Sequence, residues 1–196
     1  MRKPTLLVVA CMLTALSSCS KSERPAPANN TTNAAPSSVT PDEPAVDACA
    51  LLTAAEIESI QGEPLKEVKP LTRSYGGLTA SQCYFALPNL VNSISLQVLQ
   101  KGTGADARDP RQTWSETFSK NTPLMKGAGK TGAPEKIEGL GEEALWVGND
   151  AIGALNVLQG NHYITISVGG AGDRTTKKEK SAKLGRLVVD RLDKTH

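Results

Sequence analysis

The chain has 196 residues and a formal net charge of +2, a length that suffices for one domain and a tail. Two of its basic residues, Arg2 and Lys3, belong to the N-terminal segment described next, and the remaining 20 basic side chains match the 20 acidic ones. Such a neutral chain has no large field to steer it to nucleic acid or to an anionic membrane surface, and its 4% of aromatic residues argue against stacking platforms for bases or sugars.

An N-terminal apolar segment ends in a lipobox, the cleavage and lipidation site of a bacterial lipoprotein. The run is Leu16-Ser17-Ser18-Cys19, preceded by the charged Arg2 and Lys3 and by a short apolar stretch from Leu6 to Leu16. This stretch is too short to span a bilayer, but a signal sequence needs no more. We therefore expect residues 1–18 to be removed and Cys19 to carry the lipid that attaches the protein to a membrane.

The four cysteines have different predicted fates. Cys11 leaves with the signal peptide and Cys19 carries the lipid, so Cys49 and Cys83 remain for the exported, oxidising compartment. We predict that these two pair in a disulfide. The bridge would close a loop of about 35 residues and stabilise the fold by roughly 3–4 kcal/mol in the chain-entropy model. A redox-active or metal-binding pair is the alternative, but neither C-x-x-C spacing nor clustered histidines accompany the two residues.

Residues 19–46 combine the lipidated cysteine with a low-complexity tether. The tether is rich in Pro, Ala, Ser, Thr and Asn, and it has too little apolar mass to fold. As a random coil it would hold the domain on the order of 30 Å from the lipid. A single globular domain is expected over residues 47–196.

The domain opens with a helix. Thr53 and Glu56 have the spacing of a capping box, and Gly62 follows Gln61 as a stop signal. Three apolar side chains of this region are expected to face the core: Leu52, Ile57 and Ile60.

Strand patterns follow the first helix. A weak, short candidate surrounds Val68, and two clearer alternating patterns run over residues 82–87 and 93–98. Cys83 lies on the apolar face of the first of these patterns. The residues Pro88-Asn89 separate them, which predicts a hairpin.

A second helix is expected to begin at Asp109-Pro110, with Asp as the cap and Pro at the first helical position. Trp114 and Phe118 form its apolar stripe. The residues from Asn121 to Pro134 lack periodicity and predict a long loop.

Three strands and a final helix complete the pattern. The strands are expected at about Glu143–Val147, Ala151–Leu158 and His162–Val168, with turns at Asn149-Asp150 and Gly160-Asn161. The helix is expected over Thr175–Leu192, with an inner stripe of Leu184, Leu187, Val188 and Leu192. The predicted fold is α+β: an antiparallel sheet of about five to seven strands with three helices, in the order helix-strands-helix-strands-helix.

The run Asp47-Ala48-Cys49-Ala50-Leu51-Leu52-Thr53, with Glu56 and Gly62, resembles the opening of a family of uncharacterised bacterial envelope lipoproteins. Later features of the family are a cysteine before an aromatic residue, here Cys83-Tyr84, and a segment like Ile137–Ala144 that leads to Trp146. The resemblance covers most of Asp47–Leu192. It implies a small α+β domain similar to the PsbP-like sandwich and a disulfide, and it implies no activity.

The segment Gly127-Ala128-Gly129-Lys130-Thr131 invites comparison with a phosphate-binding loop. The required pattern is G-x-x-x-x-G-K-[ST], and Leu124 stands where the first glycine would fall. The loop should also join a strand to a helix, whereas this one runs towards Pro134. A surface loop is the better interpretation.

His162 is the only histidine within the domain apart from the C-terminal His196. It stands at the start of a strand beside a turn, where it would line a pocket mouth or act as a general base; the plainer interpretation is a hydrogen-bonded or half-solvated histidine at a strand end. Trp146 and Trp114 are expected in the core, with a pocket role open for Trp146. The sequence offers no catalytic set, no metal ligands and no cofactor motif.

Two sets of charged residues could suggest binding or catalytic sites, but we interpret both as solvated surface. Glu142 and Glu143 are adjacent and would point to opposite faces of a strand, so they cannot share one substrate. The final helix carries a basic run that would suit lipid headgroups, but it is interleaved with acids at i,i+4 spacing. Its basic members are Arg174, Lys177, Lys178, Lys180, Lys183 and Arg186.

The leading functional hypothesis is a lipid-anchored, non-catalytic binding or interaction module of the cell envelope. Its partners would be the membrane, through the lipid on Cys19, and another envelope protein or a small ligand, with no nucleic acid. The alternatives are an enzyme with a site near His162 and the Gly127–Gly132 loop, and an accessory subunit of an envelope complex. Because Ser20 rather than Asp follows Cys19, sorting to the outer membrane, facing the periplasm, is favoured in a two-membrane cell.

Overall fold

The computed structural model describes residues 45–120, 122–127, 132–170 and 172–194. All of them belong to one of the two units into which the chain divides, Pro41–His196. The predicted signal peptide, the lipidation site Cys19 and nearly all of the tether lie outside the described residues. The same holds for residues 128–131 of the segment that was compared with a phosphate-binding loop.

The described residues form an α+β fold, as the sequence predicts. The helices are the 3-10 helix η1 (Ala48–Leu51), α1 (Ala54–Gln61), the 3-10 helix η2 (Leu90–Asn92), α2 (Pro110–Phe118) and α3 (Arg174–Leu192). The strands are β1 (Glu67–Tyr75), β2 (Leu78–Ala86), β3 (Ile94–Lys101), β4 (Glu135–Lys136), β5 (Glu143–Gly148), β6 (Gly153–Gln159) and β7 (His162–Val168). Every strand pair is antiparallel, and the sheet order is β1-β2-β3-β7-β6-β5-β4.

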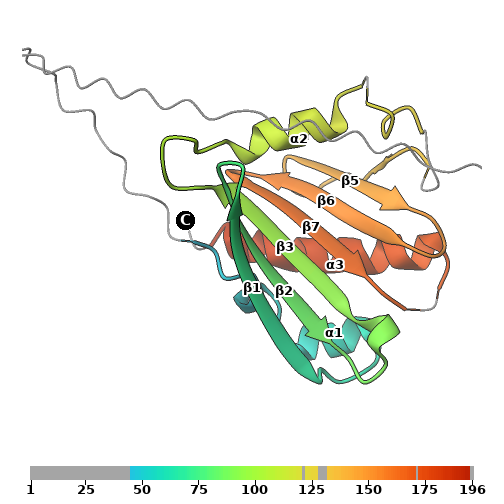
Figure 1. The fold of residues 1–196 in the computed structure, drawn as a ribbon. Helices are drawn as coiled ribbons and strands as arrows, with labels where there is room; N and C mark the ends of the chain where they lie inside the picture. The colour runs from blue at the N-terminus through green and yellow to red at the C-terminus, as the bar shows by residue number, and fades with distance from the viewer. Residues whose placement is uncertain (1–44, 121, 128–131, 171, 195–196) are drawn as a thin grey trace, which may run out of the picture. The chain divides into compact units, whose positions relative to one another are not determined.

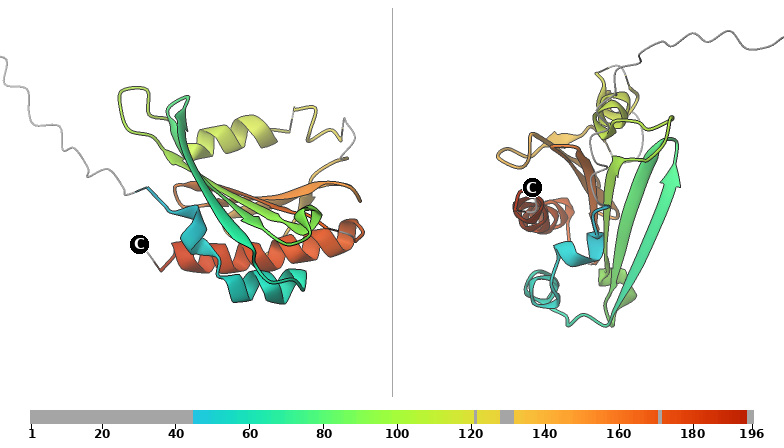
Figure 2. Two further views of the ribbon diagram at one scale, coloured as in Figure 1. Left: turned by 60° about the horizontal axis from the view of Figure 1, so that its bottom comes forward. Right: turned by 90° about the vertical axis from the view of Figure 1, so that its left-hand side faces the viewer.

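The helices cover the two faces of this sheet unequally. Figures 1 and 2 show α1 and α3 against one face, while α2 crosses the other face near one end of the strands. The long α3 packs on β6 and β7, and the shorter α2 contacts β3 and β7. Part of the second face is therefore left without a helix over it, and Figure 1 looks onto that face.

The predicted helix ends are confirmed. At α1, the Glu56 amide donates to Thr53 Oγ1 (3.3 Å) and the Thr53 amide donates to Glu56 Oε2 (2.8 Å), which completes the capping box. Gly62 ends the helix in the left-handed region, with φ of 79°. Asp109 caps α2, and Pro110 takes its first position.

Two strands differ from the expectation. β1 is nine residues long rather than short, because pairing with β2 along its whole length replaces the strand propensity that its sequence lacks. The turn Gly76-Gly77, with φ of 54° and 75°, permits this long hairpin. β6 begins at Gly153 instead of Ala151, because Asn149 Oδ1 accepts from the amides of Ala151 and Ile152 and holds them in the turn.

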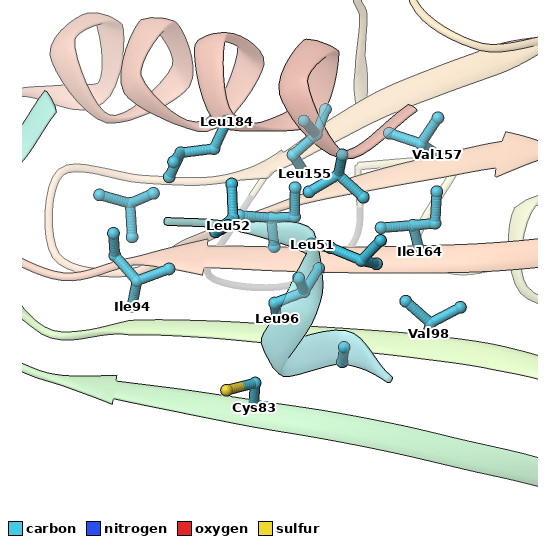
Figure 3. Close-up of a cluster of buried hydrophobic side chains, with 14 of the residues drawn as sticks. Leu51, Leu52, Cys83, Ile94, Leu96, Val98, Leu155, Val157, Ile164 and Leu184 are labelled. Atoms are coloured by element: carbon cyan, nitrogen blue, oxygen red, sulfur yellow. The ribbon is translucent and has the colours of Figure 1, made fainter. Parts of the chain in front are cut away.

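The main core lies between the sheet and the layer of α3, α1 and η1. Figure 3 shows Leu184 of α3 and Leu51 of η1 facing side chains of the sheet. The disulfide between Cys49 and Cys83 forms as predicted and joins η1 to β2, with Cys83 fully buried. The amide of Ala48 also donates to Ser81 Oγ (3.0 Å). Two consecutive residues at the start of η1 are therefore attached to β2.

A smaller apolar cluster lies on the opposite face, under α2. Trp114 and Phe118 of α2 pack on Tyr163 of β7, with ring centroids 5.5 and 6.4 Å from the tyrosine ring. The helix stripe predicted from i,i+4 spacing is thus the contact that holds α2 on the sheet.

Candidate functional site

The structure places both predicted pocket residues in the interior. Trp146 is 0% exposed in the main core, with the Arg174 guanidinium 4.9 Å from its ring centroid. His162 is 2% exposed at the start of β7, paired with Gln159 across the turn. Neither residue lines the two hollows described below.

The adjacent carboxylates serve to hold α2. Glu142 accepts two hydrogen bonds from the Arg111 guanidinium (2.6 and 2.7 Å), and Glu143 accepts one from Trp114 Nε1 (2.9 Å). The prediction that the two side chains point to opposite faces of a strand is wrong, because Glu142 precedes β5 and both reach the same helix. The bonds from Arg111 lower the pKa of the Glu142 carboxyl.

The N-terminal part of the basic run of α3 bonds to neighbouring elements. Lys177 is buried and donates to the carbonyls of Asp150 and Ala151 (2.6 and 2.9 Å). Arg174 and Lys178 both pair with Glu135, and these bonds lower the pKa of its carboxyl. This end of α3 is therefore part of the tertiary structure, and it presents fewer free cations than the sequence suggests.

The best candidate site is a pair of adjoining hollows on the face of the sheet that carries α2. One has a volume of about 370 Å³ and the other of about 430 Å³, and they share Ile152, Gly153 and Ser167. We call the two together the open-face groove. It lies over β2, β3, β6 and β7, on the part of the face that α2 leaves uncovered.

The floor of the groove carries a set of polar, uncharged side chains among apolar ones. Tyr84, Ser95 and Ser167 are direct neighbours across β2, β3 and β7, so these three residues, which we call the hydroxyl row, form a line perpendicular to the strands. Asn156 lies in the hollow nearer to α2, where its side-chain oxygen accepts from the Tyr163 hydroxyl (3.0 Å). Burial raises the pKa of the Tyr163 phenol, which therefore remains a neutral donor.

The rim of the groove is apolar at both ends. Leu90 and Val91, which are 64% and 70% exposed, stand at one end, and Ile152, which is 63% exposed, stands where the two hollows meet. At the other end the wall is formed by Phe118 at the end of α2 and by Leu124. Large aliphatic side chains with this exposure are unusual on a solvated surface when they gather around one hollow.

The lining of the groove carries no formal charge. Among the described residues that line either hollow, none is Asp, Glu, Lys, Arg or His. The available groups are hydroxyls, one side-chain amide and backbone atoms. The groove is thus suited to holding an uncharged molecule by hydrogen bonds to its floor and apolar contacts at its rim.

The sequence reasoning missed this groove. The strand patterns predict which residues face the core and assign no site to the outward positions. The signal that would have indicated it is the small size of those outward residues at Ser95, Ala154 and Ser167, which leaves room above the sheet. The helix α2 covers only one end of this face. This is a feature of the tertiary structure, which local sequence patterns do not predict.

Within the described residues, no group of three or more His, Cys, Asp or Glu side chains is placed to hold a metal ion. The same part of the chain contains no helix with the length and apolar content that crossing a membrane requires. Searches with the whole chain found no matching family model, curated protein or solved structure.

Proposed function

We propose that the protein is a lipid-anchored, non-catalytic binding module of the bacterial envelope, and that the open-face groove takes its ligand. The observation that carries the proposal is the groove itself: two adjoining hollows with polar, uncharged side chains on the floor and an apolar rim. Volumes of 370 and 430 Å³ fall within the range of small-molecule sites.

The chemistry of the lining supports binding in preference to catalysis. General acid–base chemistry at neutral pH needs a histidine, a carboxylate or a similar group within reach of the substrate, and the described lining residues supply hydroxyls and one amide instead. The enzyme alternative centred on His162 gains no support from geometry, since that side chain lies in the interior.

Attachment follows from the lipobox. Lipidation at Cys19 would hold the domain at a membrane, and the tether would give it reach. Because Ser20 follows the lipidated cysteine, the outer membrane, facing the periplasm, is the favoured location in a two-membrane cell. Membership of the uncharacterised lipoprotein family that the opening motif resembles remains a prediction.

The binding proposal is tested with the full chain, produced in a bacterium that lipidates it and extracted in polymer-bounded membrane discs. Ser167→Phe fills the groove where its two hollows meet. Ser74→Phe makes the same change on the exposed edge strand β1 and serves as the control. Mass spectrometry should recover a small molecule with the wild type and with Ser74→Phe, and not with Ser167→Phe.

Two results would overturn the proposal. Recovery of the same molecules from all three proteins, with native circular dichroism spectra, would mean that the groove holds no ligand. A hydrolytic or transfer activity of the purified protein that is lost in His162→Ala would replace the binding module by an enzyme.

A further inference from the structure

We infer that the open-face groove selects an uncharged amphiphile, which places its hydroxyl or ester groups on the hydroxyl row of the floor and its aliphatic part against the rim. The inference rests on the proposed binding function and names the ligand class of the same site. It follows from the distribution of polar groups in the groove: hydroxyl groups and one amide lie on the floor, and the most exposed aliphatic side chains lie on the rim.

The hydroxyl row has hydrogen-bonding capacity to spare. Ser95 Oγ accepts from Gln82 Nε2 (3.2 Å), so its own hydrogen is free to donate into the groove. The hydroxyls of Tyr84 and Ser167 form no side-chain hydrogen bond with the residues that the structure describes. Each hydroxyl both donates and accepts, and neighbouring strands are about 4.8 Å apart. Polar atoms at a similar spacing, as in a glycerol ester, would satisfy the row.

The second hollow continues the polar floor towards α2. The Asn156 side-chain oxygen is taken by Tyr163 and by Thr165 Oγ1 (3.4 Å), whereas its nitrogen has only long contacts to the carbonyls of Leu145 and Ala154, 3.5 and 3.4 Å away. Carbonyls only accept, so the amide nitrogen must lie on their side. Bonds at this limit are weak, and the nitrogen remains able to donate to a ligand carbonyl.

A charged head group finds no partner in this groove. Placing an ion over the floor removes part of its hydration, and no described lining side chain carries an opposite charge to compensate. An aliphatic chain, in contrast, gains contacts with Leu90, Val91 and Ile152, which are otherwise exposed to water. The groove therefore distinguishes amphiphiles by the charge of their head groups.

Three probes with the same ten-carbon chain test this selectivity: monodecanoylglycerol, decanoate and decyltrimethylammonium. Binding to the full chain in polymer-bounded discs is measured by thermal shift and by the displacement of a fluorescent neutral lipid, below the micellar concentration of each probe. We expect monodecanoylglycerol to bind at least tenfold more tightly than either charged probe.

Substitutions locate the binding. The double variant Ser95→Ala/Ser167→Ala should weaken binding of monodecanoylglycerol about tenfold without changing that of decanoate, since it removes two of the three hydroxyls of the row and no charge. Ser74→Ala on β1 should leave all three affinities unchanged, and Ser167→Phe should abolish binding of the neutral probe.

The failure of this inference differs from that of the binding function. Equal affinities for the three probes, tighter binding of a charged probe, or full affinity in the double serine variant would overturn the ligand class. The binding function would stand in those cases, provided that Ser167→Phe still loses its co-purifying molecule. If Ser167→Phe changes neither probe binding nor co-purification, both proposals fall.

Discussion

At the scale of single residues, Glu56 joins the first helix of the domain to the last. Its carboxylate accepts from Arg191 Nη2 (2.6 Å) of α3 and from the amide and hydroxyl of Thr53 (both 2.8 Å). The hydrogen bond from Arg191 is the main reason why the pKa of this carboxyl falls from 4.5 to about 2. A carboxyl with a lowered pKa contributes stability above its unfolded pKa, and the contribution is lost as the pH falls through the folded value.

We therefore expect Glu56→Gln to lower the free energy of unfolding at pH 7 by about 1–2 kcal/mol. The difference from the wild type should persist at pH 5 and shrink between pH 4.5 and pH 2, as the wild-type carboxylate takes up its proton. Urea denaturation across this range measures it. Glu58→Gln, an exposed carboxylate on the same helix, is the matched control, and an equal effect in the two variants would contradict the assignment.

At the scale of elements, two segments depend on a few specific attachments. The disulfide fixes η1 to β2, and the short α2 is held by Arg111, Trp114 and Phe118. A nine-residue helix has little stability of its own, so its tertiary contacts decide whether it forms.

Removal of the disulfide in Cys49→Ala/Cys83→Ala should lower the free energy of unfolding by about 3 kcal/mol, because the unfolded chain regains the freedom of a loop of 34 residues. Urea denaturation with and without reductant gives the comparison. Reductant should destabilise the wild type and leave the double variant unchanged. A wild type that is indifferent to complete reduction of its cysteines would refute the prediction.

Trp114→Ala should cost about 3 kcal/mol, since it removes a buried ring and the donor to Glu143. Trp114→Phe keeps most of the ring and should cost about 1 kcal/mol, mainly through the lost hydrogen bond. Unfolding followed by circular dichroism measures both. Lys120→Ala, an exposed change just beyond the helix, should have no effect; if Trp114→Ala were equally silent, α2 would not depend on this contact.

Local signals predicted most of these elements. Three of these signals depend only on residues close together in the sequence, so the sequence encodes them directly. They are the capping box at Thr53, the helix start at Asp109-Pro110 and the hairpin at Gly160-Asn161. β1 was seen only as a weak candidate, because its lysine, proline and serine residues have low strand propensity and β2 supplies its pairing. The two-residue β4 is set by its partner β5 and leaves no pattern at all.

At the scale of the whole molecule, one structural feature could be predicted from the sequence and another could not. The disulfide could be predicted, because export and the elimination of Cys11 and Cys19 leave a single pair. The groove could not, because it is formed by outward residues of several strands and by the short reach of α2. The sequence makes His162 a candidate pocket residue, but its side chain lies in the interior.

The predicted membrane attachment concerns the whole chain, and it is tested at Cys19. We expect Cys19→Ala to stay uncleaved or to lose its lipid. In either case the variant should incorporate no clickable fatty acid on metabolic labelling, and membrane fractionation then distinguishes an uncleaved form, which stays at the membrane, from a soluble one. Cys11→Ala should be lipidated and fractionate like the wild type. Labelling of Cys19→Ala at the wild-type level would refute the lipobox.

The disulfide also determines how the domain would respond to a mechanical pull. Force applied to the chain at residue 45 meets the bridge at Cys49 and passes through it into Cys83 of β2, which lies inside the sheet. The residues between the two cysteines, which include α1 and the edge strand β1, carry none of this load. A pull transmitted through the lipid predicted at Cys19 would thus bypass the first helix and the exposed edge strand and load β2 directly.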